Sequence, residues 1–209
     1  MTSIENDLIC LFDMDGTLFD YEGTMRADLV KLRSPHEPDP MTMNIWDEDT
    51  YPWLTARMHL IKMVPGWWRR LPKLKAGWEI YNIAKKIGFQ MQILTKGPSR
   101  KPHVWKEKVQ CIRKHFPRED ISSINITENK RGQYGRVLVD DFGPYMDSWL
   151  TPHCRGLGIM PVNDNNRDYQ HENVVKYDGS PDSLAEVFSA LRAAYRRDPK
   201  QHWREALEK

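Results

Sequence analysis

The sequence predicts an α/β fold: a doubly wound, Rossmann-like parallel sheet with a small helical cap inserted after the first strand. Two observations lead to this prediction. Apolar segments of strand length alternate with amphipathic helical segments along most of the chain. Residues 20–74, by contrast, contain no segment typical of a strand. We therefore expect a core formed by residues 1–19 and 75–209 and a helical cap formed by residues 20–74.

Composition indicates a folded protein of a reducing compartment. Of the 209 residues, 29% are charged and 11% aromatic, which excludes a disordered chain. The net charge of +2 does not indicate a nucleic-acid partner. The three cysteines are far apart and match no zinc pattern. We find neither a membrane-spanning run nor a signal peptide, so we expect a cytoplasmic protein without a membrane partner.

The first predicted strand carries the main functional motif. Residues 8–12 are apolar without helical spacing, as in a strand buried on both faces. Asp13 and Asp15 follow, and then Gly16, which allows the chain to turn away. Residues two apart on a strand point to the same side, and open α/β sheets bind ligands at the carboxyl ends of their strands. Both carboxylates are therefore expected at a ligand site.

Two other interpretations of this acidic segment are weaker. A helix–loop–helix calcium loop requires Gly at its sixth position and Glu at its twelfth. Counted from Asp13, these positions are Leu18 and Thr24, and a strand rather than a helix precedes the loop. The segment could otherwise be an ordinary turn that happens to be acidic.

The predicted cap consists of two helices and their connections. A short helix is expected over residues 21–33, followed by a proline-rich loop over residues 34–40. A second helix is expected over residues 47–64, with Pro52 near its first turn. Residues 67–72 form an aromatic and basic connector back to the core.

The predicted core alternates between helices and strands. Gly88 is the expected C-cap of its first helix, and Ser180 with Pro181 starts a later helix. The strands are expected over residues 89–94, 121–126, 135–139, 157–162 and 174–177, and the helices over residues 76–87, 101–115, from 180 onward, and 199–209.

Three further strand ends carry polar residues that match the first. Thr95 follows the second strand, Lys130 the third, and Asp140 with Asp141 the fourth. If these strands lie side by side, their ends bring together several carboxylates, one hydroxyl and one lysine. Crowded carboxylates repel one another unless a cation lies among them, and hard oxygen ligands that leave room for water and phosphate favour Mg²⁺.

This set of residues suits phosphoryl transfer. Asp13 is the expected nucleophile, which would form an aspartyl-phosphate. Asp15 is placed to give a proton to the leaving oxygen and then to take one from the hydrolytic water. Thr95 and Lys130 are expected to bind the phosphate oxygens, whose charge must be stabilised.

Other basic residues could compete for the phosphate role. Lys106 and Lys108 lie in a predicted helix with further basic residues, so we expect them on a solvated face and prefer Lys130. A basic cluster beside the aromatic connector leaves open a nucleic-acid 3'-end phosphatase, although a solvated surface is the more ordinary interpretation. The cluster consists of Arg69, Arg70, Lys73 and Lys75.

These motifs resemble those of the haloacid dehalogenase (HAD) superfamily. The segment 13–17, Thr95, Lys130 and the pair Asp140–Asp141 occur in the order of its four motifs. Within the superfamily, the chain is most similar to the 5'(3')-deoxyribonucleotidases. The similarity extends over residues 13–23, the connector 67–72 and the segment 126–130.

The resemblance implies a HAD-type core and cap and a magnesium-dependent phosphatase that hydrolyses nucleoside, and more specifically deoxynucleoside, 5'-monophosphates. Related enzymes are often dimers, so a homodimer is an expected assembly, and a nucleic-acid partner is not expected. The implied residues are Asp13 and Asp15 for catalysis, Thr95, Lys96 and Lys130 for phosphate, Tyr21, Trp67 and Trp68 for the substrate pocket, and Asp13, Asp15 (through its backbone carbonyl), Asp140 and Asp141 for Mg²⁺.

Two residues depart from the family pattern. Lys96 stands where the family usually has a small residue, and Glu128 stands where it has an arginine. Both positions are expected to face the substrate, so another small-molecule phosphatase stays an alternative. Two non-enzyme alternatives are a receiver-like module, which would place its acidic pair at the first strand, and a degenerate binding domain on the same fold.

Overall fold

The computed structural model describes residues 8–207 of the chain. In this range it contains one sheet of six strands in the order β3-β2-β1-β4-β5-β6, and every neighbouring pair is parallel. This is the strand order of a Rossmann-type doubly wound sheet, which confirms the predicted fold class. The strands are β1 (Ile9–Phe12), β2 (Gln90–Thr95), β3 (Ser123–Ile126), β4 (Val137–Val139), β5 (Leu157–Pro161) and β6 (Val174–Tyr177).

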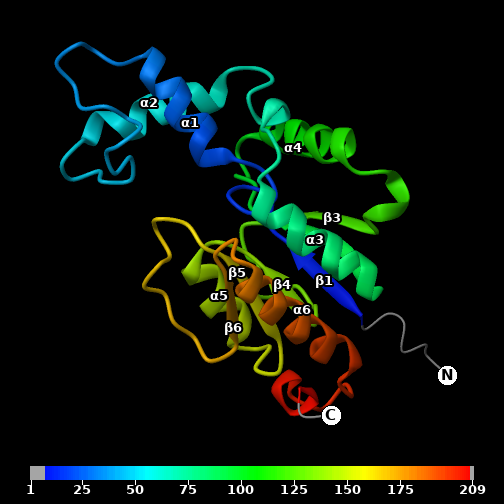
Figure 1. The fold of residues 1–209 in the computed structure, drawn as a ribbon. Coiled ribbons are helices and arrows are strands. Elements are labelled where there is room, and N and C mark those ends of the chain that lie inside the picture. The colour runs from blue at the N-terminus through cyan, green and yellow to red at the C-terminus, as the bar shows by residue number, and fades with distance from the viewer. Residues whose placement is uncertain (1–7, 208–209) are drawn as a thin grey trace.

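Helices cover both faces of this sheet (Figure 1). Alternate residues of β1 point to opposite sides, so Cys10 and Phe12 belong to one buried cluster and Leu11 to the other. The first cluster includes side chains of α3 and α6, and the second includes side chains of α5. The helices are α1 (Tyr21–Lys31), α2 (Pro52–Met63), α3 (Lys75–Ile87), α4 (Pro102–His115), α5 (Gly143–Leu150) and α6 (Pro181–Arg196).

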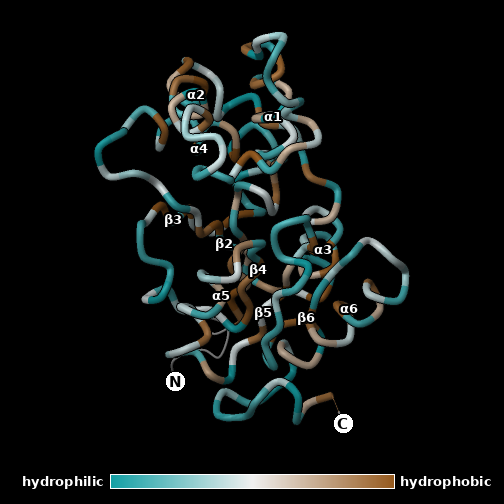
Figure 2. The backbone as a smooth tube through the Cα atoms, turned by 90° about the vertical axis from the view of Figure 1, so that its left-hand side faces the viewer, coloured by the Kyte–Doolittle hydropathy of each residue, from teal (hydrophilic) through white to brown (hydrophobic). Residues whose placement is uncertain are grey.

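Hydrophobic segments follow the strands through the middle of the molecule (Figure 2). Residues Leu11, Phe12 and Leu138 are completely buried, as expected for strands covered on both faces. None of the helices in residues 8–207 has the length and apolar character needed to cross a membrane.

Helix α3 lies directly against the loop that follows β1. A Cβ atom at Gly77 would lie 1.9 Å from the carbonyl oxygen of Thr17, so only glycine allows this approach. The indole Nε1 of Trp78 donates to the carbonyl of Leu18, 3.0 Å away, and adds a second contact to the same loop. These contacts hold the chain that carries the acidic motif in place.

Residues 20–74 contain α1, α2 and the short 3₁₀ turn η2 (Trp68–Arg70), and no strand. Figure 1 shows α1 and α2 at one end of the molecule, beyond the sheet and on the same side as α4. The predicted helix over residues 47–64 is wrong at its start, because α2 begins only at Pro52. Proline disfavours helical backbone in the residue before it, and Tyr51 has φ −131° and ψ 65°.

Two elements in the second half of the chain differ from expectation. Helix α5 was not predicted from the sequence. The helix expected over residues 199–209 is only the short turn η4 (Trp203–Ala206), and residues 208–209, like residues 1–7 of the predicted core, lie outside the described range. Arg197 donates to the backbone carbonyls of Asp198, Pro199 and Gln201, so these carbonyls bond to a side chain instead of a helical ladder.

Candidate active site

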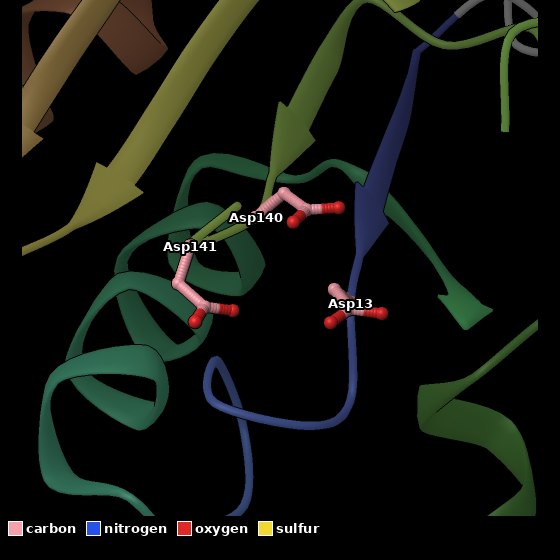
Figure 3. A group of neighbouring side chains, drawn as sticks. All are labelled: Asp13, Asp140 and Asp141. Atoms are coloured by element: carbon pink, nitrogen blue, oxygen red, sulfur yellow. The ribbon is translucent and has the colours of Figure 1, made fainter. Parts of the chain in front are cut away.

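Three carboxylates meet at the carboxyl ends of two adjacent strands (Figure 3). Asp13 follows β1, and Asp140 and Asp141 follow β4, which pairs with β1 in parallel. One ligand oxygen of each carboxylate lies within 4.8 Å of the others. The edge is the switch point at which β1 has β2 on one side and β4 on the other, where open α/β sheets bind ligands.

Lys130 joins two of these carboxylates. Its Nζ lies 2.7 Å from Oδ1 of Asp13 and 2.6 Å from Oδ2 of Asp140, and its side chain is buried. Burial lowers the pKa of Lys130, but the two carboxylates outweigh burial and hold the pKa above its usual value. Burial raises the pKa of Asp140 to about 6, although the charge of Lys130 opposes this rise. The ammonium thus compensates part of the negative charge.

Asp141 is held by hydrogen bonds to both of its oxygens. Oδ1 accepts from Oγ1 of Thr17 at 3.0 Å, and Oδ2 accepts from Nδ2 of Asn163 at 3.0 Å. Burial and then the charges of neighbouring aspartates raise the pKa of Asp141 above its usual value. Gly16 allows this carboxylate to approach: its φ is +77°, and a Cβ there would lie 2.4 Å from Oδ2 of Asp141.

Asp15 lies beside Lys108, which the sequence did not predict. The Nζ of Lys108 donates to Oδ2 of Asp15 at 2.5 Å, to Oγ1 of Thr95 at 2.9 Å and to the carbonyl of Lys96 at 2.6 Å. Only 1% of Lys108 is exposed, so the expectation of a solvated face is wrong for Lys108, whereas Lys106 is exposed. The site therefore holds two buried lysines.

The position of Lys108 in its helix could have revealed it. Val104, Lys108, Cys111 and Ile112 follow one another at steps of four, three and one, and all four are buried. Such spacing places Lys108 on the apolar face of α4. A buried lysine must have partners, so its position on this face indicates a paired ammonium.

Asp15 keeps one oxygen without a partner. Its Oδ1 is buried and makes no hydrogen bond with any of residues 8–207. Burial is the largest influence on Asp15 and raises its pKa, and the charge of Lys108 opposes the rise without cancelling it. Asp15 is also one of the residues that line the cavity described next.

A cavity of about 1380 Å³ reaches two of the three carboxylates, Asp13 and Asp141. The core contributes Asp13, Asp15 and Asp141 to its wall, and residues 20–74 contribute Tyr21 and Trp68 among others. The lining from residues 20–74 consists of Asp20, Tyr21, Glu22, Gly23, Arg26, Trp46, His59, Lys62, Met63, Trp68 and Leu74.

Three aromatic rings of residues 20–74 line this cavity. Tyr21 and Trp46 are stacked with their ring centroids 6.1 Å apart, and the ring centroids of Tyr21 and Trp68 are 5.7 Å apart. Trp67, by contrast, is 1% exposed and does not line the cavity. Its Nε1 donates to Oδ2 of Asp28 at 2.9 Å, so its ring belongs to the packing beneath the cavity. Trp46, and not Trp67, is therefore the exposed tryptophan that lines the cavity beside Trp68.

Of the two residues that depart from the family pattern, one lines the cavity and the other does not. Lys96 is exposed and lines the cavity, with its Nζ 5.9 Å from the centroid of the Tyr145 ring. Glu128 is exposed and accepts from the backbone N–H of Ser99 at 2.9 Å, and it does not line the cavity. Only Lys96 is therefore placed to meet a ligand.

The donor set suits a hard divalent cation. Carboxylate oxygens of Asp13, Asp140 and Asp141 converge, and Mg²⁺ prefers a few carboxylates together with water and phosphate oxygens. The side chain of Asp15 is outside this group and its Oδ2 is held by Lys108, so the backbone carbonyl of Asp15 stays a predicted ligand. The residues present fit a magnesium ion.

Comparisons with known proteins show what this chain is similar to. The family model of the "5' nucleotidase, deoxy (Pyrimidine), cytosolic type C protein" matches residues 7–179. A Bordetella bronchiseptica protein named "Putative 5'(3')-deoxyribonucleotidase" is 27% identical over 155 residues, which cover 72% of this chain and 82% of that protein.

Two solved structures share the fold. A dehalogenase crystal structure has a TM-score of 0.51 at 12% identity, over 89% of this chain and 97% of its own. A haloacid dehalogenase-like family hydrolase from Xanthomonas campestris has a TM-score of 0.50 at 13% identity, over 91% of this chain and 99% of its own. These similarities confirm a HAD-type α/β fold.

Proposed function

Because the chain belongs to the cytosolic type C family of 5'-nucleotidases, and is therefore a phosphoric monoester hydrolase of the HAD type, we propose that it hydrolyses deoxynucleoside 5'-monophosphates with Mg²⁺ through an aspartyl-phosphate. Family membership favours this hydrolase over a receiver-like module or a binding domain. The observation that carries the proposal is the convergence of Asp13, Asp140 and Asp141 beneath a cavity that is partly lined with aromatic rings.

The first step transfers the phosphoryl group to the enzyme. A carboxylate oxygen of Asp13 attacks the phosphorus, and the bond between phosphorus and the 5'-oxygen of the sugar breaks. Asp15 gives its proton to this leaving oxygen, so the nucleoside departs as an alcohol. The raised pKa of Asp15 and its unpartnered Oδ1 support this role, because the group can hold a proton and present it to a ligand.

The second step restores the enzyme. A water molecule attacks the phosphorus of the aspartyl-phosphate, and Asp15, now ionised, takes the proton of that water. The bond between phosphorus and the oxygen of Asp13 breaks, which releases inorganic phosphate. Each cycle consumes one water and returns both aspartates to their starting protonation.

The phosphate oxygens need positive charge and hydrogen-bond donors around them. Lys130 beside Asp13 and Lys108 beside Asp15 supply buried ammonium groups on two sides of the site. Thr95 supplies a hydroxyl, and Lys96 supplies an exposed ammonium at the cavity wall. Preorganised charges of this kind stabilise the negative charge that the transferring group carries.

The three converging carboxylates and the backbone carbonyl of Asp15 would hold Mg²⁺. When bound, Mg²⁺ offsets the repulsion among the carboxylates and neutralises charge on the phosphoryl oxygens. Without a cation, burial and mutual repulsion raise the pKa of Asp141, as expected for crowded aspartates. The donor chemistry therefore supports a magnesium-dependent enzyme.

Residues 20–74 would act as a cap that recognises the nucleoside. Tyr21, Trp46 and Trp68 present aromatic rings to the cavity, and stacking of a base on such a ring contributes about 1–3 kcal/mol. Nδ2 of Asn165, in the loop after β5, donates to Oε2 of Glu22 in α1 at 3.1 Å. This bond joins the cap to the core across the cavity mouth.

The proposal is tested by phosphate release with Mg²⁺ from a panel of nucleoside 5'-monophosphates and from a 3'-phosphorylated oligonucleotide. We expect turnover of one or a few deoxynucleoside monophosphates, and Asp13→Asn should reduce it by at least about 10³-fold while the fold is kept. Turnover of the oligonucleotide alone, or near-normal rates for Asp13→Asn, would contradict the proposal.

The structure gives no support to the oligonucleotide alternative. The basic cluster beside the connector does not line the cavity, and most of it has other partners. Arg70 pairs with Asp28, the ammonium of Lys75 lies 3.6 Å from Glu79, and the ammonium of Lys73 lies over the ring of Trp78.

A further inference from the structure

Two lysines that line the cavity have no direct ion-pair partner in the described part of the chain. Lys62 lies in the last turn of α2, and Lys101 immediately precedes α4. Both line the cavity and both are half-buried. Neither side chain forms an ion pair or hydrogen bond within the part of the chain that the structure describes. Half-buried ammonium groups that face a cavity favour an anion there.

The carboxylates of the cavity do not supply this anion, because each already has a partner. Glu22 is paired with Arg26 at 2.7 Å, and Asp164 with Arg167 at 2.9 Å. The others are held by the site lysines or by hydroxyl, amide and backbone donors. The ammonium groups of Lys62 and Lys101 are therefore not paired with any carboxylate that lines the cavity.

The arrangement on α4 relates these lysines to the reaction centre. Lys101 is the N-cap of α4, and Val104 and Lys108 follow it at steps of three and four; all three line the cavity. A helix advances about 1.5 Å per residue, so the backbone positions of Lys101 and Lys108 lie about 10 Å apart along the axis, and Lys108 in turn contacts Asp15. No side chain caps the start of α4, so its positive end adds to the field at Lys101.

We propose that Lys62 and Lys101 bind a second phosphate group of the substrate, so that the preferred substrate is a deoxynucleoside bisphosphate with phosphates at the 5' and 3' positions. This inference rests on the proposed function, because the first phosphate is the one that Asp13 attacks. The cavity of about 1380 Å³ is larger than the roughly 300–1,000 Å³ typical of small-ligand sites, which leaves room for the second group.

The electrostatics of the pair agree with a doubly charged ligand. Burial lowers the pKa of Lys62, and the charge of Lys101 lowers it further, while Asp15 acts in the opposite direction. Two like charges that repel each other are stabilised by an anion between them. A phosphate with two negative charges satisfies both lysines, whereas the uncharged 3'-hydroxyl of a monophosphate satisfies neither.

The test is a binding measurement that does not depend on turnover. Isothermal titration of the Asp13→Asn protein, with Mg²⁺ present, compares deoxyadenosine 3',5'-bisphosphate with deoxyadenosine 5'-monophosphate. The bisphosphate should bind at least about tenfold more tightly, as expected for charge-assisted hydrogen bonds. Adding Lys62→Met and Lys101→Met should remove that advantage and change affinity for the monophosphate by less than about twofold.

Lys106→Met is the matched control, because Lys106 is an exposed lysine of the same helix outside the cavity wall. Thermal unfolding checks that all variants are folded. Equal affinity for the two nucleotides, or equal losses for both in the double variant, would overturn the second phosphate site. Tighter binding of a 5'-phosphorylated dinucleotide, whose second anion is a diester, would overturn the choice of a bisphosphate.

The two failures can be told apart. If the protein without substitutions hydrolyses neither nucleotide, the proposed function is contradicted whatever the titration shows. If it hydrolyses the monophosphate but the titration shows no bisphosphate preference, only the second phosphate site is overturned.

Discussion

The ammonium group of Lys108 donates to one carboxylate oxygen of Asp15, while the other oxygen is buried and has no hydrogen-bond partner among the described residues. Lys108 reaches this position from α4, whereas Asp15 lies in the loop after β1, so the contact joins two segments that are far apart in the sequence. The same ammonium holds Thr95 at the end of β2. One buried lysine thus positions both the proposed proton donor and a proposed phosphate ligand.

We expect Lys108→Met to reduce kcat for a deoxynucleoside monophosphate by about 10²-fold or more, because general acid–base catalysis by a positioned group contributes about 10²–10⁴-fold. Methionine keeps most of the length of the side chain, so the apolar packing of α4 is largely retained. Steady-state kinetics measures the change. Lys106→Met on the same helix is the control and should behave like the unmodified protein; comparable losses in both variants would contradict a specific role for Lys108.

Trp46→Ala should weaken recognition of the base. Trp46 is 41% exposed at the cavity wall and stacks on Tyr21. Loss of one stacking partner should lower kcat/KM for a deoxynucleoside monophosphate by about 5- to 100-fold, mostly through KM. Deoxyribose 5-phosphate has no base, so its kinetics should not change. Trp53→Ala, which removes a ring outside the cavity wall, is the matched control. Equal effects on both substrates would argue against stacking.

Removal of divalent cations should abolish phosphate release. After treatment with EDTA, titration with Mg²⁺ should restore activity. The carboxylates of Asp13, Asp140 and Asp141 converge, and in the described part of the chain Lys130 is the cation that pairs with two of them. Asp141→Asn should raise the Mg²⁺ concentration needed for half-maximal activity, since an amide is a weaker ligand than a carboxylate. Full activity in excess EDTA would rule out the magnesium requirement.

Asp28→Asn should destabilise the packing beneath the cavity in a pH-dependent way. Asp28 is 8% exposed, accepts from Lys31 and Trp67, and pairs with Arg70. Burial alone would raise its pKa, but these partners outweigh burial and hold the pKa below its usual value. Removing the charge should cost about 1–3 kcal/mol in the free energy of unfolding at pH 7.

The sign of the pH effect follows from this lowered pKa. A carboxylate whose folded pKa is below its unfolded value of about 3.9 stabilises the fold above pH 4 and loses this contribution as pH falls through the folded pKa. The difference between Asp28→Asn and the unmodified protein in urea unfolding should therefore shrink below pH 4. Asp164→Asn, which breaks a surface pair, is the control and should show little effect at any pH. A difference that did not change with pH would contradict this assignment.

The strands were the most predictable part of the fold. Residues that form β1 and β4 are continuous apolar runs that end in aspartates, and burial on both faces leaves no other pattern for a parallel strand. Because parallel strands end at one edge, the sequence also predicted that Asp13 and Asp140 would meet there. The roles of these residues in catalysis stay predictions.

The missed features depend on contacts between distant segments. Helix α5 has only eight residues and begins at Gly143 and Pro144, so its pattern is too short to distinguish from a loop. Trp46 and Trp67 have the same side chain, and only the packing of α1 against the connector decides which one faces the cavity. Lys108 was not predicted because the other basic residues of α4 suggested a solvated face, although its spacing places it on the apolar face of the helix.

The strand order has a consequence for how the protein folds. Strand β1 lies in the middle of the sheet, yet Ile9 pairs with Gln90 on one side and Cys10 pairs with Val137 on the other. These strand pairs join residues that are far apart in the sequence. Folding is slow in such a topology, because long loops must close, at a cost in entropy, before the pairs can form. The chain that carries Asp13 therefore lacks one of its two neighbouring strands until Val139 has been synthesised. We expect apolar β1 to be the segment most exposed to chaperones and to aggregation during biosynthesis.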